Sequence, residues 1–517
     1  MNLELVRTLA LMEARMRLRR PATLVTLLAV VALSWLLVPD PASGTTQIAV
    51  HGARVLYTSS SLALGSASMA TLLVGLAGFY LLRGRMAEDL RSGAGGVIGA
   101  SPAGRAAFLL GRWCGGVLYL LALLGAFMLT VLACHLVRGE GPLEPLVYLQ
   151  TFALVLAPMA LFAASCALLC DAWAPLMGKA GDLLYFAGWV AQLGMLAGAG
   201  AAGAHTGAPP FDFTGMGAIV AALAKQVDVH DMMLGLADFD RAKAPITLPS
   251  WLWTPQLALG RCLTALLALL PLLPALALFH RFSPDRVKPA RARARRSPLA
   301  LVNGWARPLA RLAGPLFALA ARLPGIAGQA LADAALTLVS NPAAIALLLA
   351  AQVAALTLDG AALPALLLAC VAGWGILASE LSTRDAEAAC DALGAALPGG
   401  AARRYWRQLG AALLLGCMSC GLAALRLAFL APLRAAALAA GLFALAALAS
   451  LLGRASGSAR TFLALFLFGL YVSVNAHGVP ALDVVGFQDA ANAASVLGWA
   501  ATGLLAAWAG HLWNRRA

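Results

Sequence analysis

The residues whose types could support a specific chemistry form a short charged stretch between positions 83 and 105. The acidic pair Glu88 and Asp89 is followed by Arg91, and the helical pattern of the stretch breaks at Gly93 and again at Pro102. Charged side chains on a short helix suit an ion-paired contact with another protein. No nucleophile beside a general base stands out, so we expect recognition and not catalysis. The candidate residues of this stretch are Glu88, Asp89, Arg91, Ser92, Gly93, Ser101, Pro102 and Arg105.

A second stretch of the same character lies between positions 379 and 400. It also opens with charged residues and ends at proline and glycine, although the step found at Ser92 and Gly93 is missing from it. Charged loops are often only solvated connectors, but the duplication favours a shared role for the two stretches. The candidate residues here are Glu380, Arg384, Asp385, Glu387, Leu397 and Pro398.

The sequence contains no motif for binding ATP or a metal ion. It has no Gly-x-x-x-x-Gly-Lys-Ser/Thr loop, and the nearest match, at Gly178, lacks both the earlier glycine and the final hydroxyl. We therefore expect no enzyme activity, no catalytic residue and no cofactor in this chain. The tight group of Asp228, His230 and Asp231 is interpreted as part of a short surface helix within 216–240 and not as a metal site.

The rest of the chain supplies the elements that must hold these stretches in place. Its composition is 61% hydrophobic and only 12% charged, and a helix that crosses a bilayer needs about 20 mostly apolar residues. We predict an all-α polytopic membrane protein with about twelve transmembrane helices. The predicted spans lie near 22–38, 62–82, 106–136, 145–170, 181–203, 255–280, 342–358, 361–379, 404–424, 432–452, 460–476 and 491–512.

Basic residues indicate which side of the membrane the loops occupy. Most of the 37 lysines and arginines fall in loops on one side when the N-terminus is placed in the cytoplasm. The positive-inside rule then predicts that both termini are cytoplasmic, and we assign the chain to a bacterial inner membrane. The net charge of +14 reflects this topology. Nucleic-acid binding is disfavoured because no basic patch is interleaved with aromatic residues.

The sequence carries a weak internal repeat. In each copy a helical stretch ends just before a proline, at Pro21 and at Pro342, and runs into a predicted span. Because proline disfavours the helical conformation of the residue before it, we expect the chain to bend at both junctions. The first stretch is interpreted as an amphipathic elbow helix on the cytoplasmic leaflet, with Glu13 and Arg17 pointing away from its apolar face. Its candidate residues are Leu5, Leu9, Met12, Met16, Arg19, Arg20 and Pro21.

The repeat divides the spans into two halves of six. Because six is even, each half starts and ends on the same side, so the halves are parallel repeats with a pathway between them. The predicted domains are 1–281 and 326–517, and the segment 282–325 between them is a basic, proline-rich cytoplasmic linker.

The elbow and the charged stretches together resemble the permease subunits of type-2 ATP-binding-cassette (ABC) exporters. Those permeases open with an elbow helix and carry an acidic loop with a Ser-Gly step and a small-residue–Pro turn between spans two and three. The residues of the first stretch that fit this pattern are Glu88, Asp89, Arg91, Ser92, Gly93, Ser101, Pro102 and Arg105. The second stretch fits it more loosely, at Arg384, Asp385, Leu397 and Pro398. The resemblance implies that both stretches are cytoplasmic coupling helices.

The same resemblance implies the partners of the chain. A separate ATPase subunit, present as a pair, would bind ATP and Mg²⁺ and dock on the coupling helices. The chain would contain both permease halves and would work as an exporter surrounded by membrane lipid. The resemblance is also compatible with an accessory periplasmic or membrane protein as a further partner.

Two other functions stay open from the sequence. Twelve spans in parallel halves are also the architecture of ion-coupled secondary carriers, but the first loop lacks the Gly-x-x-x-Asp-x-x-Gly-Arg signature of the major-facilitator family. The centres of the spans are also nearly free of the carboxylates and histidines that ion relays use. An integral membrane enzyme or a non-transporting membrane scaffold is the third possibility.

Overall fold

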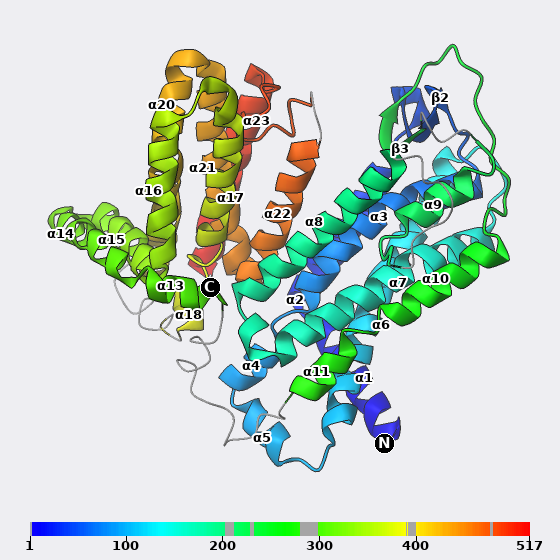
Figure 1. The fold of residues 1–517 in the computed structure, drawn as a ribbon, viewed down its shortest axis with the longest axis horizontal. Coiled ribbons are helices and arrows are strands. Elements are labelled where there is room, and N and C mark those ends of the chain that lie inside the picture. Colours follow the sequence, from blue (N-terminus) through cyan, green and yellow to red (C-terminus); the bar gives the residue numbers. More distant parts are fainter. Residues whose placement is uncertain are drawn as a thin grey trace. The chain divides into compact units, whose positions relative to one another are not determined.

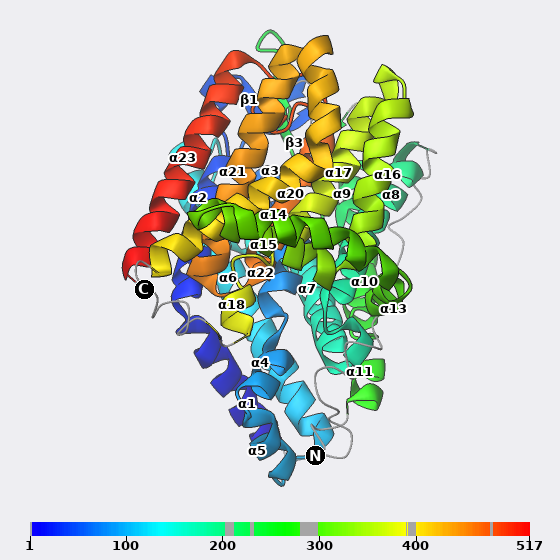
Figure 2. The ribbon, with the colours of Figure 1, turned by 90° about the vertical axis from the view of Figure 1, so that its left-hand side faces the viewer.

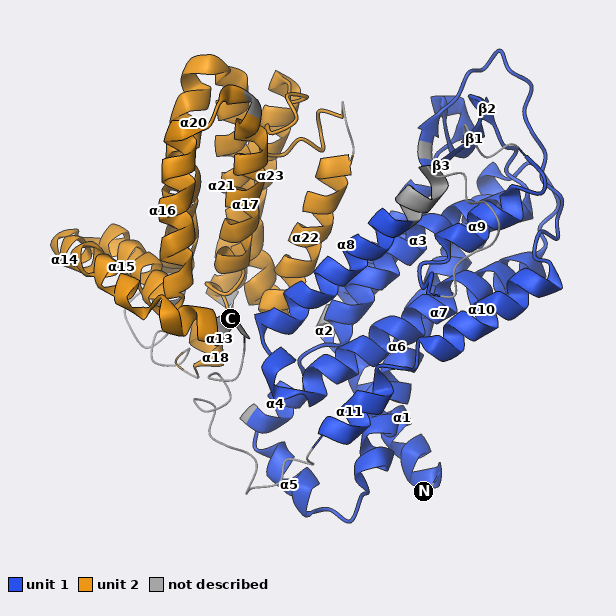
Figure 3. Ribbon diagram, in the orientation of Figure 1, with its two compact units in different colours: residues 1–297 blue, residues 298–517 orange. Residues whose placement is uncertain are grey.

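The structure, a computed structural model, describes residues 3–201, 211–227, 232–279, 298–388, 390, 400–475 and 479–516. It is 77% helical (Figure 1). The chain forms two compact units, Met1–Ser297 and Pro298–Ala517, each with its own internal packing (Figure 3).

Unit 1 is built from long helices joined by short connections. Several of them begin with proline in the first turn, where the missing N–H would have no helical partner in any case. Its helices are α1 (Leu3–Leu18), α2 (Pro21–Leu37), α3 (Ser59–Leu82), α4 (Arg85–Arg91), α5 (Ala94–Ala100), α6 (Arg105–Arg138), α7 (Pro145–Ala172), α8 (Lys179–Ala201), α9 (Met216–Leu223), α10 (Pro255–Leu267) and α11 (Leu272–Leu278), with 3-10 turns η1 (Pro41–Ser43) and η2 (Ala174–Leu176).

Over its described residues unit 2 contains helices and connecting turns but no strand. It begins with three short elements and continues as a bundle of longer helices. These are α13 (Pro298–Trp305), η3 (Arg307–Ala313), α14 (Gly314–Arg322), α15 (Gly325–Ser340), α16 (Pro342–Thr357), η4 (Gly360–Ala362), α17 (Leu363–Ala378), α18 (Arg384–Glu387), α20 (Gly400–Leu430), α21 (Pro432–Ser456), α22 (Ala459–Asn475) and α23 (Ala493–Arg516).

A helix occupies each of the predicted apolar runs, but not all of these helices are long enough to count as spans by themselves. Among the described residues seven helices are long and apolar enough to cross a membrane, or up to nine when two bent pairs are included. The bends are 75° between α1 and α2 and 104° between α15 and α16, each at a residue that precedes proline. The all-α class, with seven to nine candidate spans, is therefore confirmed. The number twelve and the division into two six-span halves stay predictions.

Unit 1 also contains a small antiparallel sheet that was not predicted. Strand β1 (Thr45–Val50) lies between β2 (Ala53–Arg54) and β3 (Met232–Asp238). The prediction of a surface helix over 216–240 is right only for α9, because the later part pairs with a strand far away in the sequence. The group of Asp228, His230 and Asp231 lies outside the described residues.

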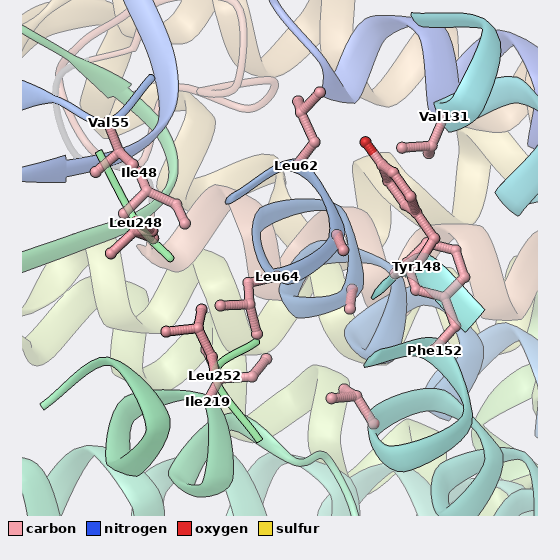
Figure 4. Packing of buried hydrophobic residues seen from close by; sticks show 14 of the residues in the cluster. Ile48, Val55, Leu62, Leu64, Val131, Tyr148, Phe152, Ile219, Leu248 and Leu252 are labelled. Atoms are coloured by element: carbon pink, nitrogen blue, oxygen red, sulfur yellow. The ribbon is translucent and has the colours of Figure 1, made fainter. Parts of the chain in front are cut away.

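The sheet is held on the helices of unit 1 by a buried apolar cluster. Ile48 and Val55 from the sheet region, Leu62 from α3, Tyr148 from α7 and Ile219 from α9 all belong to it (Figure 4). Because this core is distinct from the charged end of α3, the sheet and the candidate site lie in separate parts of unit 1.

Close helix packing fixes the elbow helix in both units. A Cβ atom built on Gly111 of α6 would lie 2.6 Å from the Leu9 Cβ, and one on Gly115 would lie 2.6 Å from the Glu13 Cβ. In unit 2 a Cβ on Gly410 of α20 would lie 3.0 Å from the Ala330 Cβ of α15. Small residues let α1 approach α6 and α15 approach α20 at short distance.

Candidate functional site

The first charged stretch forms two short helices at the end of α3. Gly84 and Gly93, with φ of 88° and 78°, adopt the left-handed conformation that glycine tolerates without strain. Gly84 lies between α3 and α4, and Gly93 lies between α4 and α5, so each glycine begins a new helix. Figure 1 shows α4 and α5 in light blue, at the end of unit 1 where α6 begins. The predicted short helices broken at glycine are thus present.

Asp89 points into the protein and not towards a partner. Its side chain is only 7% exposed and its Oδ2 lies 2.6 Å from Arg112 Nη2. Arg112 belongs to the second turn of α6, and its guanidinium carbon lies 4.7 Å from the centroid of the Phe108 ring. This buried ion pair ties α4 to the start of α6.

Glu13 joins the elbow helix to the same place. It is buried, with Oε1 accepting from Arg17 Nε at 2.8 Å and Oε2 lying 3.6 Å from Arg85 and 3.8 Å from Arg112. Arg17 also donates to the carbonyl oxygens of Leu81 and Leu82 at 3.1 and 3.3 Å, at the C-terminal end of α3. A cation is favourable at that end of a helix.

Glu88 forms the outer part of this arrangement. It is 46% exposed, and its Oε2 lies 2.9 Å from Arg20 and 2.7 Å from Arg85. Such solvated pairs add little stability by themselves. We call the whole set the first network, and it consists of Glu13, Arg17, Arg20, Arg85, Glu88, Asp89 and Arg112.

A second set of charges at the end of α3 was not predicted from sequence. The Arg83 side chain is fully buried, pairs with Asp171 of α7 and bonds Asp182 of α8 at 2.9 Å. The Gly84 N–H donates to the Asp171 carboxylate at 3.0 Å, and Arg83 donates to the Leu176 carbonyl at 2.7 Å. We call Arg83, Asp171 and Asp182 the α3-end cluster. The sequence shows that all three residues lie at the edges of apolar runs. It does not show that they pair, because their pairing depends on the tertiary fold.

A small cavity lies between the first network and the α3-end cluster. It measures about 20 Å³ and is lined by Arg17, Arg85 and Arg112 and by Asp171, which gives room for about one water molecule. The Arg112 Nη1 atom is buried and has no hydrogen-bond partner among the described residues. The charged groups of α1, α4, α6 and α7 therefore meet at one small space, whose remaining lining is apolar and consists of Leu82, Trp113, Gly116, Ala164, Ala167 and Leu168.

Unit 2 repeats the central ion pairs of the first network. Arg407, in the first turns of α20, lies 2.7 Å from Asp333 of the elbow-like helix α15 and 2.7 Å from Asp385 of α18. Arg384 of α18 donates to the Thr337 hydroxyl at 2.6 Å. We call these five residues the second network. In both units an arginine near the start of the helix after the loop pairs with a loop aspartate and lies against an acidic residue of the elbow.

The other predicted site residues lie around these networks. Ser92 and Ser101 donate to backbone carbonyls of α4 and α5, at 3.3 and 2.8 Å. Pro102 is exposed before α6, which begins at Arg105. Glu380 is half-buried between α17 and α18, and Glu387 is exposed at the end of α18. Leu397, Pro398 and the side chain of Arg91 lie outside the described residues.

The elbow helix α1 presents a different face from the one predicted. Its buried residues are Ala10, Glu13, Ala14 and Arg17, at helical spacing against α6, whereas Met12 is exposed. The prediction that Glu13 and Arg17 point away was wrong, because their charges are paired inside the protein. The predicted apolar face is only partly covered, since Leu5 and Leu9 are half-buried and Met16 is exposed. Of the remaining candidate residues, Arg19 is exposed, Arg20 forms an ion pair with Glu88, and Pro21 begins α2.

The ion pairs of this region connect the first loop to several helices of unit 1. Buried ion pairs hold α4 to α1 and α6, and the α3-end cluster holds the same corner to α7 and α8, so the loop and four helices would move as one body. Among the described residues no group of three or more His, Cys, Asp or Glu side chains could hold a metal ion.

Comparison with known proteins gives no match to any family, curated protein or solved structure.

Proposed function

We propose that this chain is the permease subunit of an ATP-driven transporter of the ABC type, with two six-span halves and cytoplasmic termini in a bacterial inner membrane. The observation that carries the proposal is the repetition of one ion-paired joint, Asp89–Arg112 with Glu13 and Asp385–Arg407 with Asp333. We use the word joint for this set of ion pairs, which connects a short loop helix, an elbow helix and a long helix. Such a connection suits a protein whose loops are pushed by a partner subunit.

The partner in this proposal is a pair of ATPase subunits that bind ATP and Mg²⁺. Asp89 is engaged internally, so the docking surface on the first loop is α5, where Val97 is 75% exposed. Ser92 before α5 and Pro102 after it are also exposed. An apolar side chain raised on a short helix suits insertion into a groove of the partner. Export is the expected direction, and an accessory protein on the outer side is compatible with the architecture.

Movement would pass from the ATPase to the spans in a fixed order. A push on α5 reaches α4, and from there it passes through Asp89 to α6 and through Arg85 and Glu13 to α1. The α3-end cluster passes the same displacement to α7 and α8. Because these links are charge pairs that are buried or largely shielded from solvent, the helices would tilt together instead of bending separately.

The test is purification of the tagged chain in mild detergent, followed by mass spectrometry and an ATPase assay. We expect an ATPase with a phosphate-binding loop to copurify, and Val97→Asp on α5 to reduce its recovery at least about tenfold by placing a charge in the docking groove. Leu143→Asp, on the exposed connection before α7, is the matched control. A chain that purifies alone under all conditions would contradict the proposal.

The α3-end cluster favours one second candidate, an ion-coupled secondary carrier. Asp171 and Asp182 are buried carboxylates at the ends of apolar helices, and such groups can take part in ion relays. A carrier would move its cargo in vesicles that hold a proton or sodium gradient and no ATP. Transport that depends on Asp171 under a gradient, with no effect of ATP, would favour the carrier.

A further inference from the structure

The segment before the elbow-like helix of unit 2 is folded against that unit. Residues 298–322 fall within the predicted linker, yet they form α13, η3 and α14. The Asn303 side-chain oxygen accepts from the Ala343 N–H at 3.1 Å, which satisfies a free donor in the first turn of α16. Ala313 and Ala320 are buried on the inner side of η3 and α14.

The last helix of this segment, α14, lies crosswise to the bundle of unit 2 together with α15. α14 packs on α15, and α15 turns by 104° from α16. Figure 2 shows α14 and α15 running across the long helices α16, α20 and α21, and Figure 1 shows the same relation from the side. If α16 crosses a bilayer, a helix at this angle lies in the plane of its surface.

The outward side of this segment is apolar. Trp305 is 82% exposed and Leu301, one helical turn earlier, is 57% exposed. Leu312, Leu319 and Leu323 are also exposed on η3 and at the end of α14. A soluble surface rarely carries so many large apolar side chains together, so this face is expected to be covered.

The charge of the segment is entirely positive. Arg307, Arg311 and Arg322 are exposed, and the sequence has no acidic residue from 298 to 332. No ion pair joins these arginines to another described residue. Arg322 neighbours Leu323, so positive charge flanks the apolar stripe, which is the pattern of helices that lie in a membrane interface.

We propose that α13, η3 and α14 form a membrane-surface anchor that buries Trp305 and its apolar neighbours among lipid chains and binds anionic phospholipid headgroups through Arg307, Arg311 and Arg322. Tryptophan is favoured at this depth of a bilayer, and each arginine near an anionic surface adds attraction. The proposal depends on the chain lying in a membrane and not on the transport function, so either can fail alone.

The test is photo-crosslinking of the full chain in lipid nanodiscs. Trp305→benzoylphenylalanine places an aromatic photoprobe at the anchor, and the same replacement of Val97 on α5 and of Trp508 on α23 gives probes for a loop and for a span. Discs are made with phosphatidylcholine alone or with one third phosphatidylglycerol. Mass spectrometry then identifies whether lipid or protein is attached to each probe.

We expect lipid adducts at position 305, with at least about a threefold higher yield when phosphatidylglycerol is present. The triple variant Arg307→Gln, Arg311→Gln, Arg322→Gln should lose that dependence, whereas the triple lysine variant should keep it, which separates charge from folding. Position 508 should give lipid adducts in both discs and position 97 should give few. Adducts at 305 only to protein, from the same chain, a second copy or an ATPase, would overturn the proposal, as would lipid adducts insensitive to anionic lipid.

Discussion

At the residue scale, the proposed coupling depends on charges that are buried and paired. Asp89 and Arg112 are almost fully shielded from solvent and each is the other's closest opposite charge. Removing one partner of a buried pair leaves the other charge unsatisfied, which typically costs about 3–5 kcal/mol. The exposed pair of Glu88 and Arg20 has no such penalty.

Asp89→Asn or Arg112→Gln should therefore destabilise the purified chain strongly, whereas Glu88→Gln should change its stability by less than about 1 kcal/mol. Thermal unfolding in detergent measures the difference as a shift in Tm. The double variant Asp89→Asn, Arg112→Gln should lose less than the sum of the single losses, because the two residues are coupled. Additive losses would show that the pair does not act as a unit.

The sequence allowed only part of this site to be predicted. Glu88, Asp89 and Arg384 could be selected because acidic and basic residues on a short loop stand out between apolar runs. The partners Arg112 and Arg407 could not be assigned, because an ion pair between separate helices depends on tertiary packing. The burial of Glu13 was missed for the same reason, since a charged residue in an amphipathic helix is normally placed on the solvent side.

At the element scale, the elbow helix is held by the close approach that glycine allows. A side chain at Gly115 would collide with Glu13 and with the Ala10 carbonyl oxygen, 2.7 Å from the added Cβ. A Cβ at Gly125, in the same helix α6, would meet nothing within 4 Å. The two positions thus separate the effect of packing from that of helix propensity, which favours replacing glycine at both.

Gly115→Leu should release α1 from α6, lower the Tm by several degrees and expose the arginines of α1 to trypsin. Gly125→Leu should leave Tm and proteolysis close to those of the unaltered chain. Limited proteolysis with mass spectrometry identifies the cut sites. Equal behaviour of the two variants would show that α1 is not docked on α6 in the membrane protein.

The helices themselves were the best predicted part of the fold, because each apolar run is a local property of the sequence. The sheet was missed, since β1 and β3 are far apart in the chain and are too short to show a clear pattern. The bends before Pro21 and Pro342 were predicted correctly, because proline restricts the residue before it. The helical state of 298–322 was missed because proline and arginine there also fit a linker.

At the scale of the whole molecule, the two units contain the same ion-paired joint, although the helices and strands around it differ. Unit 1 has two short helices in its loop, a buried cluster behind them and a sheet at another point, whereas unit 2 has α18 and the surface segment α13 to α14. Retention of the ion-paired joint in both, despite these differences, is the reason to place the shared function there. In an ATP-driven permease both joints would carry force from the ATPase pair.

The most direct test of that claim is the ATPase rate of the complex reconstituted in lipid nanodiscs. Asp89→Asn together with Asp385→Asn removes the loop charge of both joints, and Asp359→Asn together with Asp489→Asn changes two exposed carboxylates outside both networks. We predict that the first variant still binds the ATPase but that its permease-dependent ATPase rate falls at least about tenfold, which corresponds to about 1.4 kcal/mol. A loss of this size is well within the cost of breaking the buried Asp89–Arg112 pair together with the partly exposed Asp385–Arg407 pair. The control should keep its rate. An unchanged rate in the first variant, or the absence of any bound ATPase, would contradict the account.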